Sequence, residues 1–205
     1  KHMKKDKKKI CVSGYGYVGK AMVNMLKDHY DVYVFDPLYK EDITPEGINF
    51  VNKPDDFPTD CVLGVIAVPT PMREDGSCDL SMAEDAINKM QTPVILIKST
   101  ILPGTTDRLK KETGKRICFS PEFIGESSYF TPWWKGYPHP TDMKYQEYQI
   151  FGGDRKDTEH VLEVVKPILG PACEYWQTES KVAELVKYFE NTWGLSKVTI
   201  FNEFY

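Results

Sequence analysis

Short apolar runs alternate along the chain with segments whose apolar residues recur every three or four positions. Runs of this length are typical of buried strands, and the three-to-four spacing is typical of amphipathic helices. The pattern predicts strands at 9–14, 31–36, 61–71, 92–100, 115–123 and 147–153, and helices at 18–30, 80–90, 105–113 and 157–169. Because strands and helices alternate, we predict an α/β fold with a doubly wound, mostly parallel sheet.

The helical pattern near the C-terminus is longer than the others. Val182, Leu185, Val186, Phe189 and Trp193 recur at helical spacing, and residues 202–205 contain no glycine or proline that would end a helix. We therefore expect three parts: a basic tail at 1–8, an α/β domain at 9–178, and at 179–205 the start of a long helix. A helix without a terminator also suggests a second domain that this chain does not contain.

Composition and charge narrow the class of protein. Hydrophobic residues make up 41% of the chain and charged residues 27%, which is ordinary for a globular protein. The net charge of −4 offers no electrostatic case for nucleic acid. The one basic run, at 4–9, has two interpretations: a solvated end or a phosphate-binding arm. No stretch reaches the length of a membrane span and no signal peptide is visible, so we predict a cytoplasmic protein without a membrane partner.

The five cysteines are odd in number and widely separated, without a C-x-x-C pair. This spacing excludes the common zinc motifs and argues against a disulfide framework, so no metal site is expected. Cys11, Cys61 and Cys118 lie inside apolar runs, where cysteine is most often a small core residue.

The sequence GYGYVG at 14–19 has the spacing of a dinucleotide-binding loop. It follows a predicted strand, opens a predicted helix, and is followed by Asp36 at the end of the next strand. Gly14 allows the tight turn, Gly16 lets the backbone approach a pyrophosphate, and Gly19 lets the helix pack on the strand. The carboxylate of Asp36 can accept hydrogen bonds from ribose hydroxyls and repels a 2′-phosphate. The context predicts a Rossmann-like domain that binds NAD, with FAD as the open alternative.

Further segments, in the same order along the chain, carry a family resemblance. They are VPTP at 68–71, KSTILPGTT at 98–106, SPEFIGES at 120–127, and AELVKYFEN at 183–191 with Lys197 and FNE at 201–203. Together with the glycine loop, these segments resemble the UDP-glucose/GDP-mannose dehydrogenases, which are NAD-dependent nucleotide-sugar dehydrogenases. The resemblance implies an N-terminal NAD-binding domain followed by the start of a central helix.

The resemblance implies oxidation of a sugar C6 alcohol to a carboxylate in two NAD-linked steps, of the UDP-glucose to UDP-glucuronate type. Thr100 is expected to position water near the reacting carbon. Glu122 and Glu126, one helical turn apart, suit general-base work and water orientation. Lys187 and Asn191 share a helix face and can stabilise a developing oxyanion. Each residue also has a purely structural or solvated interpretation.

The NAD-binding residues implied by the resemblance come from the glycine loop, the second strand's end and the two later loops. They are Gly14, Tyr15, Gly16, Tyr17, Val18, Gly19, Asp36, Val68, Pro69, Thr70, Ser99, Thr100 and Glu126.

Two features depart from the resembled family. Ser120 and Gly125 stand where that family usually has Asn and often a larger residue, which leaves the sugar open. The aromatic segment 129–142, which contains His139, has no counterpart and is either a sugar-stacking lid or packing.

The family's nucleophilic cysteine, in a G-G-x-C-x-P-x-D motif, does not occur in these 205 residues. We therefore expect this chain to bind NAD without turning over a nucleotide sugar. The alternatives are a related β-hydroxyacid-type dehydrogenase and a non-catalytic NAD-binding or dimerisation module. The apolar face of residues 182–204 predicts a homodimer.

Overall fold

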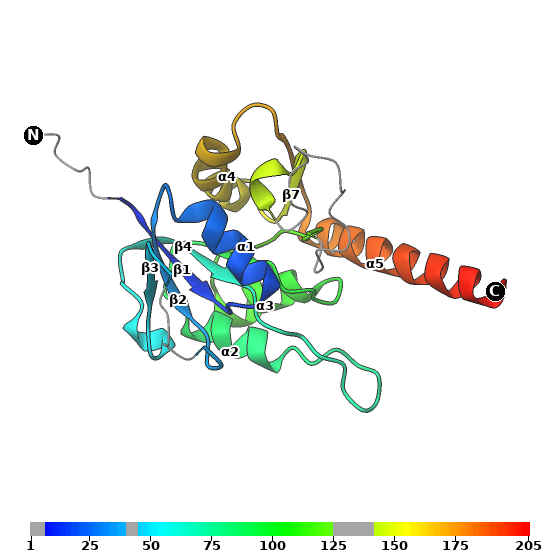
Figure 1. Cartoon of the computed structure of the whole chain (residues 1–205). Helices are drawn as coiled ribbons and strands as arrows, with labels where there is room; N and C mark the ends of the chain where they lie inside the picture. The colour runs from blue at the N-terminus through cyan, green and yellow to red at the C-terminus, as the bar shows by residue number, and fades with distance from the viewer. Residues whose placement is uncertain (1–6, 40–44, 125–141) are drawn as a thin grey trace, which may run out of the picture.

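A computed structural model describes residues 7–39, 45–124 and 142–205. These residues form one eight-stranded sheet in the order β3-β2-β1-β4-β5-β6-β7-β8 (Figure 1). All neighbouring strands are parallel except β6 and β7, which pair antiparallel at Phe119 and Gly152. The strands are β1 (Lys9–Ser13), β2 (Asp31–Phe35), β3 (Ile48–Phe50), β4 (Cys61–Ile66), β5 (Ile95–Ile97), β6 (Ile117–Phe119), β7 (Tyr148–Gly152) and β8 (Glu174–Thr178).

Helices cover both faces of the sheet, as the alternating pattern predicts. One apolar cluster joins α1 and α4 to one face, and a second joins α2 and α3 to the other. The doubly wound, mostly parallel fold is therefore confirmed. The helices are α1 (Tyr17–Leu26), α2 (Ser81–Lys89), α3 (Thr105–Thr113), α4 (Arg155–Leu169) and α5 (Ser180–Glu203), with short 3-10 turns η1 (Pro54–Asp56) and η3 (Met143–Tyr145).

The sequence pattern missed β3 and β8 and overextended several strands. β3 has three residues inside a polar, proline-bearing stretch, and β8 has no fully buried residue to produce an apolar run. β4 ends at Ile66, so the VPTP segment is a loop after the strand. Both missed strands are stabilised by pairing with a neighbouring strand, a tertiary contact that a local pattern does not encode.

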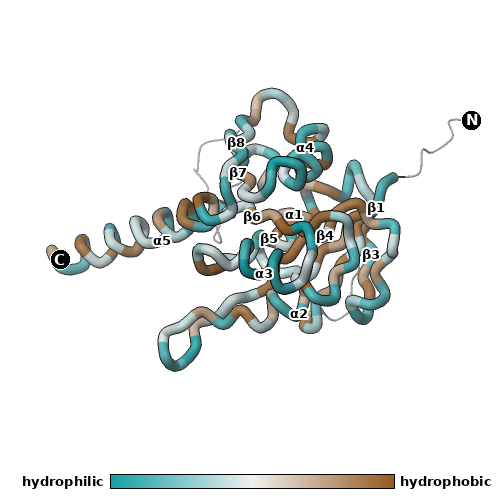
Figure 2. The backbone as a smooth tube through the Cα atoms, turned by 180° about the vertical axis from the view of Figure 1, so that it is seen from behind, coloured by the Kyte–Doolittle hydropathy of each residue, from teal (hydrophilic) through white to brown (hydrophobic). Residues whose placement is uncertain are grey.

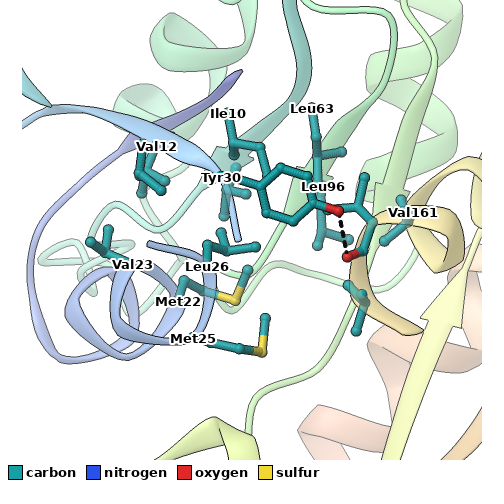
Figure 3. Close-up of a cluster of buried hydrophobic side chains, with 14 of the residues drawn as sticks. Ile10, Val12, Met22, Val23, Met25, Leu26, Tyr30, Leu63, Leu96 and Val161 are labelled. Atoms are coloured by element: carbon teal, nitrogen blue, oxygen red, sulfur yellow. Dashed lines mark hydrogen bonds between the residues drawn. The ribbon is translucent and has the colours of Figure 1, made fainter. Parts of the chain in front are cut away.

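The core between the sheet and α1 is closely packed. Figure 3 shows side chains from β1, α1 and β4 around the ring of Tyr30, whose hydroxyl donates to the carbonyl of Val164 at 3.0 Å. This bond satisfies the one polar atom of a buried ring and ties α4 to the connection between α1 and β2. The interpretation of Cys11, Cys61 and Cys118 as core residues is confirmed: they are buried and all five cysteines are free thiols.

Helix α5 starts on the sheet and then projects away from it (Figure 2). Its first turn packs closely on β7, because a Cβ added at Gly152 would lie 2.6 Å from that of Ala183. Farther along, large apolar side chains are exposed, Phe189 at 71% and Trp193 at 64%. Within the described part of the chain, no helix has the length and apolar character needed to cross a membrane.

Candidate functional site

A cleft of about 590 Å³ lies over the carboxyl ends of the central strands. The strand order reverses at β1, which has β2 on one side and β4 on the other. In doubly wound sheets such a switch point is where ligands bind. The residues that line the cleft are Tyr15, Gly16, Tyr17, Val18, Lys20, Asp36, Leu38, Tyr39, Ala67, Val68, Pro69, Thr70, Lys98, Ser99, Thr100, Glu122, Ile124 and Lys187.

Most of the expected site residues meet in this cleft, although they come from distant parts of the chain. Gly14 and Gly19 are buried and are absent from the described lining. Glu126, Gly125 and His139 lie outside the described residues, as does nearly all of the aromatic segment. Asn191 is exposed on α5 and is absent from the described lining. The roles of these residues stay predictions.

The three loop glycines differ in the space around them. At Gly14, with φ +98°, an added Cβ would lie 2.3 Å from the carbonyl oxygen of Ala67. At Gly19 it would lie 2.1 Å from the carbonyl oxygen of Gly14, so this pair needs glycine for packing. At Gly16 an added Cβ would meet nothing within 4 Å. Gly16 therefore faces the open cleft, as a backbone approached by a pyrophosphate requires.

The carboxylate of Asp36 is oriented by the backbone. One oxygen accepts from the N–H of Tyr15 at 2.7 Å and the other from the N–H of Leu38 at 2.8 Å. These two bonds hold the carboxylate at the cleft wall beside the glycine loop, where it can receive ribose hydroxyls. We call the wall formed by residues 15–20 and 36–39 the glycine-loop end of the cleft.

Aromatic rings support the glycine-loop end. Tyr39 stacks on Phe50 with ring centroids 3.9 Å apart, and Tyr15 contacts both rings edge-on. The edge-to-face geometry is the favoured one for such pairs. The rings join the glycine loop to β3, which explains why a three-residue edge strand matters to the site.

The opposite wall contains a buried ion pair. The ammonium of Lys98 lies 2.8 Å from the carboxylate of Glu122, and both side chains are at most 5% exposed. Lys98 also donates to the hydroxyl of Ser120 and to the carbonyl of Pro121. We call the wall formed by Lys98, Glu122, Ile124 and Lys187 the carboxylate end of the cleft.

Glu122 is held in its ionised form. Burial alone would raise the pKa of its carboxyl, but Lys98, Gln146 and the N–H of Phe123 lower the pKa below the usual range. A carboxylate with a lowered pKa is a weak proton acceptor at neutral pH. The general-base role of Glu122 and water orientation by its charge both stay predictions.

Lys187 reaches the cleft from the second turn of α5. Its ammonium lies 3.0 Å from the carboxylate of Glu190 and 5.4 Å from the ring centroid of Phe123. Across the cleft, the hydroxyl of Thr70 donates to the carbonyl of Thr100 at 2.7 Å, which ties the two loops after β4 and β5 together. Thr100 and Lys187 thus line one cavity, and their catalytic roles stay predictions.

A buried carboxylate fixes α5 against the loop that carries Thr100. Glu184, fully buried, accepts hydrogen bonds from the N–H groups of Gly104 and Thr106, at the start of α3. Unpaired N–H groups at a helix N-terminus favour an anion. Because Lys187 follows one turn later, this contact helps to set its position beside the cleft.

Sequence reasoning missed six residues that line the cleft. Lys98 stands inside the quoted KST segment, and Tyr39 lies three positions after Asp36, so both had a signal nearby. Ile124 likewise stands inside the quoted 120–127 segment, and Lys20, Leu38 and Ala67 lie within two positions of the glycine loop, Asp36 and the VPTP segment, but nothing in the sequence singles them out as cleft residues. The six are Lys20, Leu38, Tyr39, Ala67, Lys98 and Ile124. Across residues 7–39, 45–124 and 142–205, no cluster of three metal-ligating side chains occurs.

Comparison with known proteins points in one direction. A family model described as UDP-glucose/GDP-mannose dehydrogenase family, NAD binding domain, matches residues 35–135. The match begins after the glycine loop, so the loop's assignment depends on its geometry and on the longer alignments. One such relative, the UDP-N-acetyl-D-mannosamine dehydrogenase of Methanococcus maripaludis, is 29% identical over all of this chain and 52% of its own length. The chain thus spans about half of that relative.

Other matches vary in substrate but agree in class. The UDP-glucose 6-dehydrogenase of Rickettsia felis is 27% identical over 67% of this chain and 31% of its own length. A solved structure of UDP-D-ManNAc dehydrogenase from Pyrococcus horikoshii superposes with a TM-score of 0.76, at 24% identity, over 96% of this chain and 53% of that one. At this identity the structural match supports the fold alone.

Proposed function

The chain belongs to the UDP-glucose/GDP-mannose dehydrogenase family and carries its NAD-binding domain, and from this premise we propose that the whole protein oxidises a nucleotide sugar. The reaction is the conversion of a sugar C6 alcohol to a carboxylate in two NAD-linked steps. The observation that supports it best is the meeting of two groups in one cleft: the glycine-loop end, and Thr100 with Lys187 opposite.

Each end of the cleft has its own task in this proposal. The N–H groups at the start of α1 and the carboxylate of Asp36 hold the pyrophosphate and the ribose of NAD. NAD, when bound, supplies the hydride acceptor. Thr100 orients the reacting group and water, and the ammonium of Lys187 stabilises negative charge that develops on the sugar oxygen. The Lys98–Glu122 pair keeps a fixed charge pattern beneath them.

The substrate class is a nucleotide sugar, with the UDP-glucose type as the specific proposal. The relatives described above act on different sugars, UDP-N-acetyl-D-mannosamine and UDP-glucose according to their names. Ser120 does not face the cleft, because it is fully buried and accepts a hydrogen bond from Lys98. Its departure from Asn therefore acts through Lys98 rather than through a direct sugar contact.

We also propose that α5 forms a homodimer through its exposed apolar face. Phe189, Trp193, Val198 and Phe201 are each more than half exposed. Sedimentation of the wild-type chain and of the double variant F189S/W193S tests this. A dimer that dissociates in the variant supports the proposal, and a wild-type chain that sediments as a monomer contradicts α5 as a sufficient interface.

Isothermal titration of the 205-residue chain with NAD and NADP tests the cofactor proposal. We expect NAD to bind with 1:1 stoichiometry and more tightly than NADP, and Asp36→Ala to reduce that preference. The chain contains no G-G-x-C-x-P-x-D motif, so we expect no NADH from UDP-glucose. Production of NADH by this chain alone would contradict that expectation, and failure to bind NAD would contradict the cofactor site.

A further inference from the structure

Three lysines line the cleft, and one of them differs from the others in its surroundings. Lys98 is 2.8 Å from the carboxylate of Glu122, and Lys187 is 3.0 Å from that of Glu190. Lys20 is exposed and makes no ion pair with any described residue. Its ammonium instead lies 5.5 Å from the centroid of the Tyr15 ring.

The position of Lys20 in α1 is unusual for a cation. It lies in the first turn, which contains no acidic residue, and its own N–H donates to the carbonyl of Gly16. The N-terminal turn carries the positive end of the helix dipole, so a cation there is unfavourable for the free helix. No described residue forms an ion pair with Lys20, whereas a bound anion would.

Helix geometry places Lys20 on the same face of α1 as Gly16. Residues four apart share one face of a helix, and helical side chains lean toward the N-terminus. Lys20 therefore leans along the face that begins at Gly16, where an added Cβ would meet nothing within 4 Å. The contact with Tyr15 keeps the ammonium on the cleft side of the loop.

We propose that Lys20 is a cofactor-binding residue whose ammonium contacts the pyrophosphate of NAD. This inference rests on the proposed NAD site and extends it: the backbone N–H groups of α1 supply the cradle, and Lys20 supplies the full positive charge. Asp36, at the same end of the cleft, is already held by two backbone N–H groups and serves the ribose. The two side chains therefore recognise different parts of one ligand.

The test compares ligands with and without phosphate on one variant. Wild type and Lys20→Ala are titrated with NAD, and ADP and adenosine are measured by displacement of NADH fluorescence. Loss of a charge-assisted contact predicts that NAD and ADP bind roughly tenfold more weakly, while adenosine changes less than about twofold. Lys20→Arg should stay within about threefold of wild type, because the charge remains.

Lys27→Ala is the matched control, since it removes the same charge from the other end of α1, outside the cleft. It should bind NAD as wild type does. Equal weakening of adenosine and NAD in Lys20→Ala would assign the effect to the packing of Tyr15 and overturn the inference, as would unchanged NAD affinity. If wild type binds neither NAD nor ADP, the proposed function fails and the inference fails with it.

Discussion

The two walls of the cleft differ in whether their lysine side chains are paired with carboxylates. At the carboxylate end, Lys98 and Glu122 neutralise each other in a buried pair, and Lys187 is paired with Glu190. At the glycine-loop end, Gly16 faces open space and Lys20 has no carboxylate partner within the described ranges. Both lysines of one wall are paired with carboxylates, and the lysine of the other wall is not.

This difference suggests that one wall binds the ligand and the other holds side chains in fixed positions. A wall that must receive an anion gains from exposed N–H groups and an unpaired cation. A wall that holds groups in fixed positions gains from pairs whose geometry is set by many bonds, because a buried charge without a partner is costly. Substitutions should therefore affect stability at the carboxylate end and ligand affinity at the glycine-loop end.

The largest effect is expected for Lys98→Met. This change leaves the carboxylate of Glu122 buried without its cation and should lower the free energy of unfolding by about 3–5 kcal/mol. Urea unfolding measures it. The double variant K98M/E122M should recover most of the loss, and Lys89→Ala, which removes an exposed pair with Asp85, is the control. A small loss in K98M would contradict the importance of the pair.

A pair of glycine substitutions should separate stability from binding within one loop. Gly14→Ala combines a positive φ with a clash against Ala67 and should cost about 2–4 kcal/mol. Gly16→Ala meets no protein atom, so its stability should stay near wild type while NAD affinity falls roughly tenfold or more. Thermal unfolding and isothermal titration on both variants check this. Equal destabilisation of the two would refute the division of roles.

A third prediction concerns pH. Because the pKa of the Glu122 carboxyl is lowered in the folded chain, the unfolded chain binds a proton more readily, and the stability from this group is present above its unfolded pKa and declines in acid. Glu122→Gln should be roughly 1–3 kcal/mol less stable than wild type at neutral pH. That gap should narrow as the pH falls through the acid range. Unfolding titrations at several pH values measure it, and a constant gap would count against this account.

The smallest effect is expected for Glu190→Gln. Glu190 is 52% exposed, so its carboxylate is solvated, although its partner Lys187 is only 15% exposed. Breaking it should change the free energy of unfolding by less than about 0.5 kcal/mol. A loss comparable to that of Lys98→Met would remove the distinction between the two lysines. Chemical unfolding of both variants in the same buffer makes this comparison direct.

The order of strands and helices and the glycine loop could be predicted from local patterns. Buried strands such as β1 and β4 are continuous apolar runs, and the α1 helix shows its buried face at helical spacing. The loop at 14–19 is short enough for spacing alone to encode its turn. By contrast, β3 and β8 depend on pairing with neighbouring strands, and no continuous run of apolar residues predicts them.

The candidate site divides in the same way. Motifs and the family resemblance were enough to predict Asp36, Thr100 and Lys187 as candidate site residues. The pairing of Lys98 with Glu122, the buried contact of Glu184 with α3, and the unpaired state of Lys20 were not. These depend on distances between residues far apart in the chain.

By itself, the sequence determined that this chain folds as an α/β domain with a dinucleotide loop, because periodicity and short motifs are local properties. Only the tertiary structure decided which charged side chains form ion pairs and which line the cleft without a described partner. The physical reason is that ion pairing depends on which groups surround a charged side chain. In this fold those groups come from β5, β6 and α5 at one end of the cleft and from β1 and α1 at the other.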